Sequence, residues 1–400
     1  MNRRLAASLL DGLGLLLAVA SVLAVLYSWD PTRLWLKRQA TDAADRYDRV
    51  PAALAALPVA GWLKVRDAGA AAETRGLLIN RIFGLLQLPA DMLPARILRD
   101  VDKTPGAHHA CLSARGPAAV HLLSRIDAFD ARALACEAPF YAGWENLAGI
   151  DELTGVMKAG ATAYSIGYFR PKRGNGRLIL LHAGLGATYH DLHRLIEGWI
   201  AQGAAVAAFN MPGHGDNACR DAERHCTGAP LPPPLDGVPA QHFLPPVIAV
   251  NHALAQGGIT QVAMAGLGAG AWVAAVSAAL DARITRSVLV AGVLPEPLLT
   301  RRDDGARAVV AGIRDLAGML DLAVMAADRP GRRQLQVFNR FDACCFEGPR
   351  PTLFAALLTK TAADLGGQLA VEFDDSHARH KMSAWARGRI DAFLGGEVVP

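Results

Sequence analysis

The feature that most constrains the fold is a change of pattern after Gly160, where short β-rich runs begin to alternate with stretches of helical length. The β-rich runs are ATAYSIGYF, RLILLHAG, AAVAAFNMPG, QVAMAG, SVLVAG, LQVFNRFD and QLAVEFDDSH. Strands that alternate with helices predict βαβ units and a mostly parallel sheet. Because these runs are apolar throughout, we expect helices on both faces of the sheet. The sequence therefore predicts an α/β domain over residues 155–400.

Two long interruptions divide this predicted domain. One is a Pro-rich stretch at 216–246 that contains GAPLPPPLDGVP, and the other is a helical insert near 297–330. Both follow strand ends, where open α/β sheets bind ligands, so we expect cap insertions there. The region before the domain, residues 31–154, is predicted to be mostly helical with proline interruptions, and we find no catalytic pattern in it.

The N-terminal segment, residues 1–30, is strongly apolar. Two arginines precede an apolar stretch from Leu5 to Tyr27 that only Asp11 interrupts. As a helix this stretch would span roughly 34 Å, about the thickness of a bilayer core. We favour an uncleaved membrane anchor, with the globular part exported to a periplasmic or other extracytoplasmic compartment. A signal peptide with a cleavage site at Ala18-Val19-Ala20 and a buried core helix are the alternatives.

Composition excludes several classes of protein. The 400 residues include 41 basic and 37 acidic side chains, and this near-balance leaves no basic footprint for nucleic acid. Hydrophobic residues make up 52% and charged residues 20%, so the chain is not mainly disordered. Six cysteines are too few for a disulfide scaffold, and none has C-x-x-C spacing. We therefore expect no metal and no cofactor.

Export would allow some of the cysteines to form disulfides. Cys219 and Cys226 share one polar loop, and Cys111 could pair with Cys136 in the N-terminal region. Six buried thiols in a reducing compartment are the alternative interpretation.

Polar and glycine-rich turns follow five of the predicted strands and are interpreted together. His182-Ala183-Gly184-Leu185-Gly186 follows RLILL, and NMPGHG at 210–215 follows the next strand. The turn GLGAG at 266–270 follows QVAMA and opens a helix. Asp342 follows LQVFNRF, and His377 follows QLAVEFDDS.

The order and spacing of these turns resemble the α/β-hydrolase superfamily over roughly the last 240 residues. In that family the nucleophile sits at the centre of a G-x-S-x-G elbow, and the acid and the histidine follow in chain order. The resemblance implies an elbow centred on Gly268, an acid at Asp342 and a base at His377. It also implies that the backbone N–H groups of Gly184 and Ala269 form the oxyanion hole.

The departure that matters for function is Gly268 itself. Nucleophilic acyl transfer needs an oxygen or sulfur at the elbow centre, and glycine has no side chain. A water activated by His377, with Asp342 orienting the imidazole, could still attack a bound carbonyl. The same residues could equally bind a carboxylate or an ester carbonyl without cleaving it.

Other side chains are weak substitutes for the missing nucleophile. Ser277 lies inside the predicted helix, too far from the elbow. Ser376 neighbours His377, and side chains that are adjacent in a loop rarely point to one centre. Cys344 and Cys345 follow Asp342 closely enough to reach a pocket mouth, although packing or a disulfide explains them more simply.

The elbow also matches the dinucleotide-binding pattern G-x-G-x-x-A through Gly266, Gly268 and Ala271. That fingerprint requires an acidic residue at the end of the next strand, and here the strand ends in Val290-Ala291-Gly292. The missing acidic residue therefore argues against a nucleotide cofactor.

Several histidines near these turns have simpler structural interpretations. His182 is a candidate binding residue beside the oxyanion turn. At turns of this kind, however, a histidine more often hydrogen-bonds the loop backbone, and we expect this role for both His182 and His214. His380, three residues after His377, is expected at the surface.

Two functional hypotheses follow from the sequence. The first is a pseudoenzyme, a hydrolase-like binding component at the membrane with little or no catalysis, which holds a small acyl or ester ligand or a protein partner. The second is an esterase-like hydrolase of an acyl or carbohydrate ester that uses an activated water or an atypical nucleophile. The missing serine favours the first hypothesis, and the retained acid and histidine favour the second.

Overall fold

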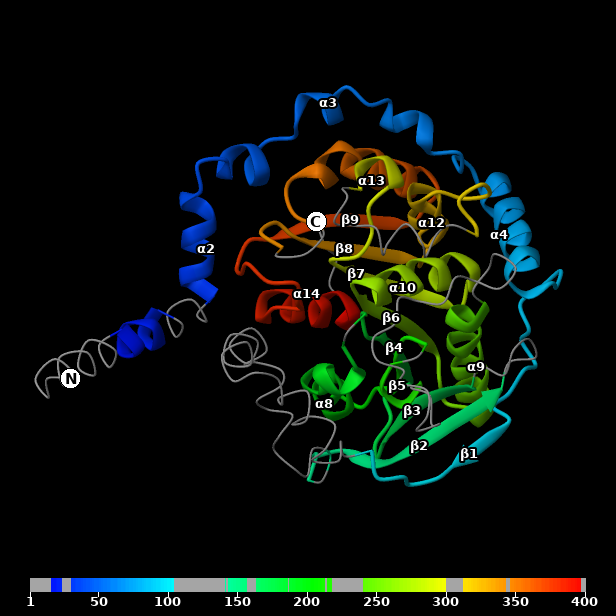
Figure 1. The fold of residues 1–400 in the computed structure, drawn as a ribbon. Helices are drawn as coiled ribbons and strands as arrows, with labels where there is room; N and C mark the ends of the chain where they lie inside the picture. The colour runs from blue at the N-terminus through cyan, green and yellow to red at the C-terminus, as the bar shows by residue number, and fades with distance from the viewer. Residues whose placement is uncertain are drawn as a thin grey trace, which may run out of the picture.

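A computed structural model describes residues 16–23, 30–103, 141, 143–156, 163–185, 187–212, 214–217, 240–299, 312–342 and 346–396 of the protein. These residues are built around a nine-stranded sheet with the strand order β1-β2-β3-β5-β4-β6-β7-β8-β9. Helices cover both faces of the sheet (Figure 1). The predicted α/β architecture is therefore confirmed at this level.

The sheet is mostly parallel, as the sequence predicts. The strands β4 to β9 run parallel to one another, whereas β1, β2 and β3 pair antiparallel, and β3 joins the parallel part by an antiparallel pairing with β5. The bounds of the strands are β1 Arg96–Leu98, β2 Leu147–Val156, β3 Ala163–Pro171, β4 Arg177–His182, β5 Ala205–Phe209, β6 Gln261–Leu267, β7 Ile284–Val290, β8 Arg333–Asn339 and β9 Gln368–Asp374.

The sheet begins earlier in the chain than the predicted domain boundary at residue 155. Strand β2 starts at Leu147, and Ile97 of β1 pairs with Leu153 of β2. Strand β1 is only three residues long and mostly exposed, which leaves too short a pattern to detect in the sequence. Part of the region predicted to be helical therefore belongs to the sheet.

Strand β4 shows why the sheet must be covered on both faces. Leu178 and Leu180 belong to one core cluster, and Ile179 and Leu181 belong to the other. Successive strand residues point to opposite faces, so an all-apolar strand requires two apolar layers. This explains the continuous hydrophobic runs of the sequence.

The helices divide between the two faces accordingly (Figure 1). Residues of α4, α9, α10, α12 and α13 build the first core cluster, and residues of α8 and α14 build the second. The bounds of the helices are α2 Asp30–Gln39, α3 Ala52–Ala55, α4 Ala68–Phe83, α8 His193–Ala201, α9 Ala240–Gln256, α10 Ala269–Leu280, α12 Met319–Met325, α13 Ala355–Asp364 and α14 Ala384–Gly395.

Most of the predicted anchor and of the predicted caps lies outside the described residues. Within the apolar stretch from Leu5 to Tyr27 only residues 16–23 are described, and they are helical. No helix in the described part of the chain is long and apolar enough to cross a bilayer. Of the two predicted cap insertions, 218–239 and 300–311 fall outside the description, and α9 and α12 begin after them. The anchor and the caps therefore stay predictions.

A buried ion cluster attaches α4 to the sheet domain. Arg75 Nη2 of α4 lies 2.5 Å from Asp328 Oδ2, and Arg332 Nη1 lies 2.9 Å from Asp328 Oδ1. Arg332 is only 2% exposed. Burial raises the pKa of Asp328, but hydrogen bonds from Arg329 and Arg75 and the nearby charge of Arg332 outweigh it and hold the pKa well below its usual range.

The substitution Asp328→Asn should reduce the free energy of unfolding by about 3 kcal/mol or more at neutral pH, because it leaves buried guanidinium groups without their counter-ion. The matched control is Asp315→Asn, since Arg81 of the same helix pairs with Asp315 at 3.0 Å on the exposed surface. That control should cost under about 1 kcal/mol. Urea unfolding measures both changes, and equal effects would contradict the assignment of the cluster.

The stabilisation that Asp328 provides should also depend on pH. Because the folded-state pKa of Asp328 is lowered, its stabilisation is complete above the unfolded-state pKa of about 4 and is lost as pH falls below it. The stability difference between wild type and Asp328→Asn should therefore narrow in acid.

Candidate functional site

The sharp turn predicted at the elbow is present. Strand β6 ends at Leu267, helix α10 begins at Ala269, and Gly268 joins them with φ of 57° and ψ of −121°. Side chains rarely adopt this positive φ, so glycine is the residue that the turn accepts without strain. The N–H of Gly268 donates to the carbonyl of Val290 at 2.9 Å, which ties the elbow to β7.

Close backbone approaches explain the other glycines of this turn. A Cβ at Gly266 would overlap the carbonyl of Gly270, and a Cβ at Gly270 would overlap the carbonyl of His182 at the end of β4. A Cβ at Gly292 would overlap the carbonyl of Gly268 from the β7 side. The G-x-G-x-G spacing is therefore a packing requirement of the elbow, and it needs no bound dinucleotide to explain it.

His380, and not His377, pairs with Asp342. His380 Nδ1 lies 2.8 Å from Asp342 Oδ2, and Asp342 is fully buried. A carboxylate only accepts hydrogen bonds, so the imidazole carries its proton on Nδ1. The other ring nitrogen, Nε2, faces the elbow, where it would lie 2.7 Å from a Cβ at position 268. Asp342, His380 and Gly268 thus meet at one point.

The predicted pairing of His377 with Asp342 is wrong. His377 is 1% exposed, its Nε2 lies 3.3 Å from Asp374 Oδ2, and its Nδ1 accepts the N–H of Arg379 at 3.1 Å. Asp374 ends β9 itself and offers His377 a nearer carboxylate than Asp342 does. Three further residues carry the chain back over the end of β8, and this return brings His380 to the elbow instead.

The Asp374 cluster fixes the loop that presents His380. Asp374 Oδ1 accepts the hydroxyl of Ser376 at 2.6 Å, and Asp374 Oδ2 accepts the hydroxyl of Ser383. Burial raises the pKa of Asp374, but hydrogen bonds from His377, Ser376 and Ser383 outweigh it and hold the pKa well below its usual range. Ser376 is therefore part of this anchor and does not point toward the elbow.

Two backbone amides lie beside the elbow, at the positions that the resemblance implies. A Cβ at Gly184 would lie 2.7 Å from the carbonyl of Leu267 and 3.8 Å from the nitrogen of Ala269. Within the described ranges, neither the N–H of Gly184 nor that of Ala269 donates to an acceptor. Ala269 is also the first residue of α10, where the helix dipole adds positive potential. This corner can therefore attract a carbonyl oxygen or an anion.

His182 and His214 each contact a backbone carbonyl of the turn in which they lie. His182 Nδ1 lies 2.8 Å from the carbonyl of Ala183, and the ring stacks on Phe209 with centroids 5.8 Å apart. Burial lowers the pKa of His182 to about 4, so the ring is neutral at pH 7. His214 Nδ1 lies 3.1 Å from the carbonyl of Pro212. Both contacts fit the structural role expected for these residues.

The remaining sequence candidates provide no nucleophile in the described residues. Ser277 is buried within α10, nine residues beyond Gly268. Cys344 and Cys345, like Cys111, Cys136, Cys219 and Cys226, lie outside the described residues. Among the His, Cys, Asp and Glu side chains that the structure describes, no group of three could hold a metal ion.

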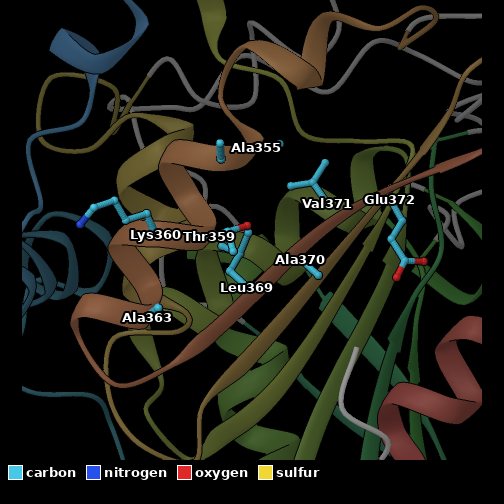
Figure 2. A pocket seen from close by; sticks show the side chains of 9 residues that line it. Ala355, Thr359, Lys360, Ala363, Leu369, Ala370, Val371 and Glu372 are labelled. Carbon is cyan, nitrogen blue, oxygen red and sulfur yellow. The ribbon is translucent and has the colours of Figure 1, made fainter. Parts of the chain in front are cut away.

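A groove of about 420 Å³ lies away from these residues, between α13 and the edge strand β9 (Figure 2). Its wall is mostly apolar, with Leu369 and Val371 from the strand and Ala355 and Ala363 from the helix. Glu372 at its end pairs with Arg389 of α14, with Oε2 2.8 Å from Nε. The groove contains no residue of the elbow, so we do not assign the chemistry to it.

Comparison with known proteins gives matches to solved structures alone. No protein-family model matches the sequence, and no curated protein does. An acetyl xylan esterase from Paenibacillus sp. R4 is 17% identical, with 68% of this chain and 93% of that chain covered and a TM-score of 0.44. An esterase from Pyrococcus furiosus is 14% identical over 62% and 90% of the two chains, with a TM-score of 0.43. A membrane phospholipase A is 17% identical over 70% and 94%, with a TM-score of 0.40. Likeness at this level says nothing of substrate.

The substitution Gly268→Ala should destabilise the protein through both strain and contact. The backbone angles cost roughly 1–3 kcal/mol for a residue with a Cβ, and His380 must also move from its position 2.7 Å away. Gly84→Ala is the matched control, because Gly84 has a φ of 69° but nothing near its Cβ position. Chemical denaturation should give a larger loss for Gly268→Ala by about 1 kcal/mol or more. An equal or smaller loss would contradict the contact with His380.

Proposed function

We propose that this chain binds an acyl or ester ligand at the elbow and hydrolyses it slowly, as a carboxylic-ester hydrolase that uses water. The observation that supports this most strongly is the orientation of His380. Its Nδ1 is held by Asp342, and its Nε2 faces position 268, where no side chain is present. A general base is therefore in place at the elbow, and among the described residues position 268 offers it no hydroxyl or thiol to activate.

The proposed reaction needs only groups of this chain and one water. The ligand carbonyl oxygen lies against the N–H groups of Gly184 and Ala269. The water oxygen attacks the carbonyl carbon while its proton passes to His380 Nε2, and Asp342 stabilises the resulting imidazolium. The tetrahedral intermediate then collapses, and its C–O bond to the alcohol breaks. The leaving alkoxide takes the proton from His380, which releases an acid and an alcohol and restores the neutral imidazole.

The expected rate is low because the covalent step is missing. In serine hydrolases that lose a triad member, the oxyanion hole and binding alone leave roughly 10³–10⁴-fold acceleration over water. We expect this chain to fall in that range, with no acyl-enzyme intermediate.

A second candidate is ligand binding without catalysis, and one distance favours it. At 2.7 Å from the Cβ position, the ring of His380 already fills part of the space that a serine side chain would occupy. Less room then remains for a water between the base and the ligand. In this alternative the site is a hydrolase-like pocket that binds carbonyl or carboxylate groups without cleaving the ligand.

The proposal includes attachment to a membrane through the apolar stretch from Leu5 to Tyr27, with the globular part outside the cytoplasm. The length and apolar character of that stretch support it. A protein partner at the membrane is compatible with both candidates. The near-balance of charge supports no role in nucleic-acid binding.

Hydrolysis of p-nitrophenyl acetate tests this function. Wild type should turn over without a burst, and His380→Ala and Asp342→Asn should each lower the rate by at least tenfold, since both remove the oriented base. His193→Gln is the control, because His193 lies on α8 and contacts the carbonyl of His190. This control should keep the wild-type rate.

The other outcomes separate the two candidates. Equal hydrolysis by wild type and His380→Ala, with tryptophan fluorescence still quenched by an uncleaved ester, would favour binding alone. A stoichiometric burst in wild type would show that a protein nucleophile exists and would contradict attack by water.

A further inference from the structure

We infer that Asp30 and Lys37 of helix α2 are positioning residues for His380 and Asp342. The segment of residues 30–49, here called the N-terminal arm, then contributes to the geometry of the site. Helix α2 lies at the left of Figure 1, beside the ends of β8 and β9 from which the two loops emerge. The inference rests on the proposed function for its catalytic meaning, but its geometry stands without it.

Asp30 holds both neighbours of His380. Its Oδ1 lies 2.8 Å from Arg379 Nε, and its Oδ2 lies 2.6 Å from Lys381 Nζ. Arg379 and Lys381 directly precede and follow the histidine in the chain. One carboxylate therefore clamps the loop on both sides of the base, and its charge offsets two cations that flank the imidazole.

Lys37 holds the loop of the acid from the same helix. Its ammonium group donates to the carbonyl of Phe341 at 2.7 Å and to the carbonyl of Asp342 at 2.9 Å. Asp30 and Lys37 are seven residues apart, which is about two helical turns, so both side chains project from one face of α2. That face bridges the two loops that must stay in register for the Asp342–His380 contact.

Other contacts dock the arm against both loops: Ala43 and Tyr47 share a small buried apolar cluster with Phe341 and with Ala378, which lies two residues before His380. Tyr47 packs on Phe341 with centroids 4.8 Å apart, and Arg46 pairs with Glu347 at 2.9 Å. Within the domain, the amide of Asn339 supports the backbone of the same loop, 2.9 Å from the carbonyl of Lys381. Without Asp30, the loop would keep this backbone support but lose the clamp on its side chains.

The effect on chemistry follows from geometry. A displacement of about 1 Å at a catalytic group can cost about 100-fold in rate. The side chain of His380 is 29% exposed and stacks on Phe346 with ring centroids 6.3 Å apart, and the clamp adds a constraint on the backbone at both sides of the histidine.

The test uses the full chain with the substitutions Asp30→Asn and Lys37→Met. Two readouts are followed: the low-field proton resonance of His380 Nδ1–H, which reports its bond to Asp342, and the kinetics of p-nitrophenyl acetate hydrolysis. Each variant should broaden or lose the resonance and lower kcat by about 10- to 100-fold with KM nearly unchanged. The conservative variant Asp30→Glu should restore part of both signals.

Asp42→Asn and Arg49→Gln are the matched controls. They remove exposed charges of the same arm, where Asp42 pairs with Arg46 at 3.7 Å and Arg49 with Asp45 at 3.5 Å, and neither Asp42 nor Arg49 pairs with a described residue of the two loops. Both controls should leave the resonance and kcat as in wild type. A resonance that survives in folded Asp30→Asn and Lys37→Met would overturn the inference, as would equal losses in the controls.

The two readouts keep this inference apart from the proposed function. An inactive wild type whose resonance depends on Asp30 and Lys37 would refute ester hydrolysis and support the positioning role. An active wild type in which the two substitutions change neither resonance nor kcat would refute the positioning role and leave the hydrolase proposal standing.

Discussion

The tight turn at Gly268 is the constraint on which the rest of the site depends. The ends of three adjacent strands, β4, β6 and β7, meet there so closely that a Cβ at Gly266, Gly270 or Gly292 would overlap a backbone carbonyl. Between these close approaches Gly268 turns the chain with a positive φ, and α10 begins at the same corner with its N-terminal amides. The amides of Gly184 and Ala269 and the imidazole of His380 all lie at this corner.

Glycine at position 268 adopts the backbone angles of this turn without strain, and it places no side chain at the corner. His380 Nε2 faces this position, 2.7 Å from where a Cβ would lie. The corner therefore brings together an imidazole, the carboxylate that orients it and two backbone amides, and the proposed function rests on these groups.

Sequence patterns predicted the parts of this molecule that local rules determine. The alternation of apolar runs and helical stretches identified the sheet, and the glycine spacing at 266–270 identified the elbow. Asp342 was found because it directly follows its strand. The choice between His377 and His380 depended on how a nine-residue return loop folds around Asp374, and spacing alone carries no signal for that.

The contacts of the N-terminal arm with the two loops of the site could not be predicted from the sequence either. Its contacts with the site join residues some 300 or more positions apart, such as Lys37 with Asp342 and Asp30 with Lys381. Long-range ion pairs leave no local pattern, and a short edge strand such as β1 leaves almost none. These features become evident only once the fold brings the two ends of the chain together.

The assignment of the base is tested most directly by the tautomers of the two histidines, measured by ¹⁵N NMR on histidine-labelled protein at a pH where both rings are neutral. His380 should carry its proton on Nδ1, facing Asp342, and His377 on Nε2, since its Nδ1 accepts the N–H of Arg379. The reverse pattern, with the Nδ1 proton on His377 and the Nε2 proton on His380, would contradict the account.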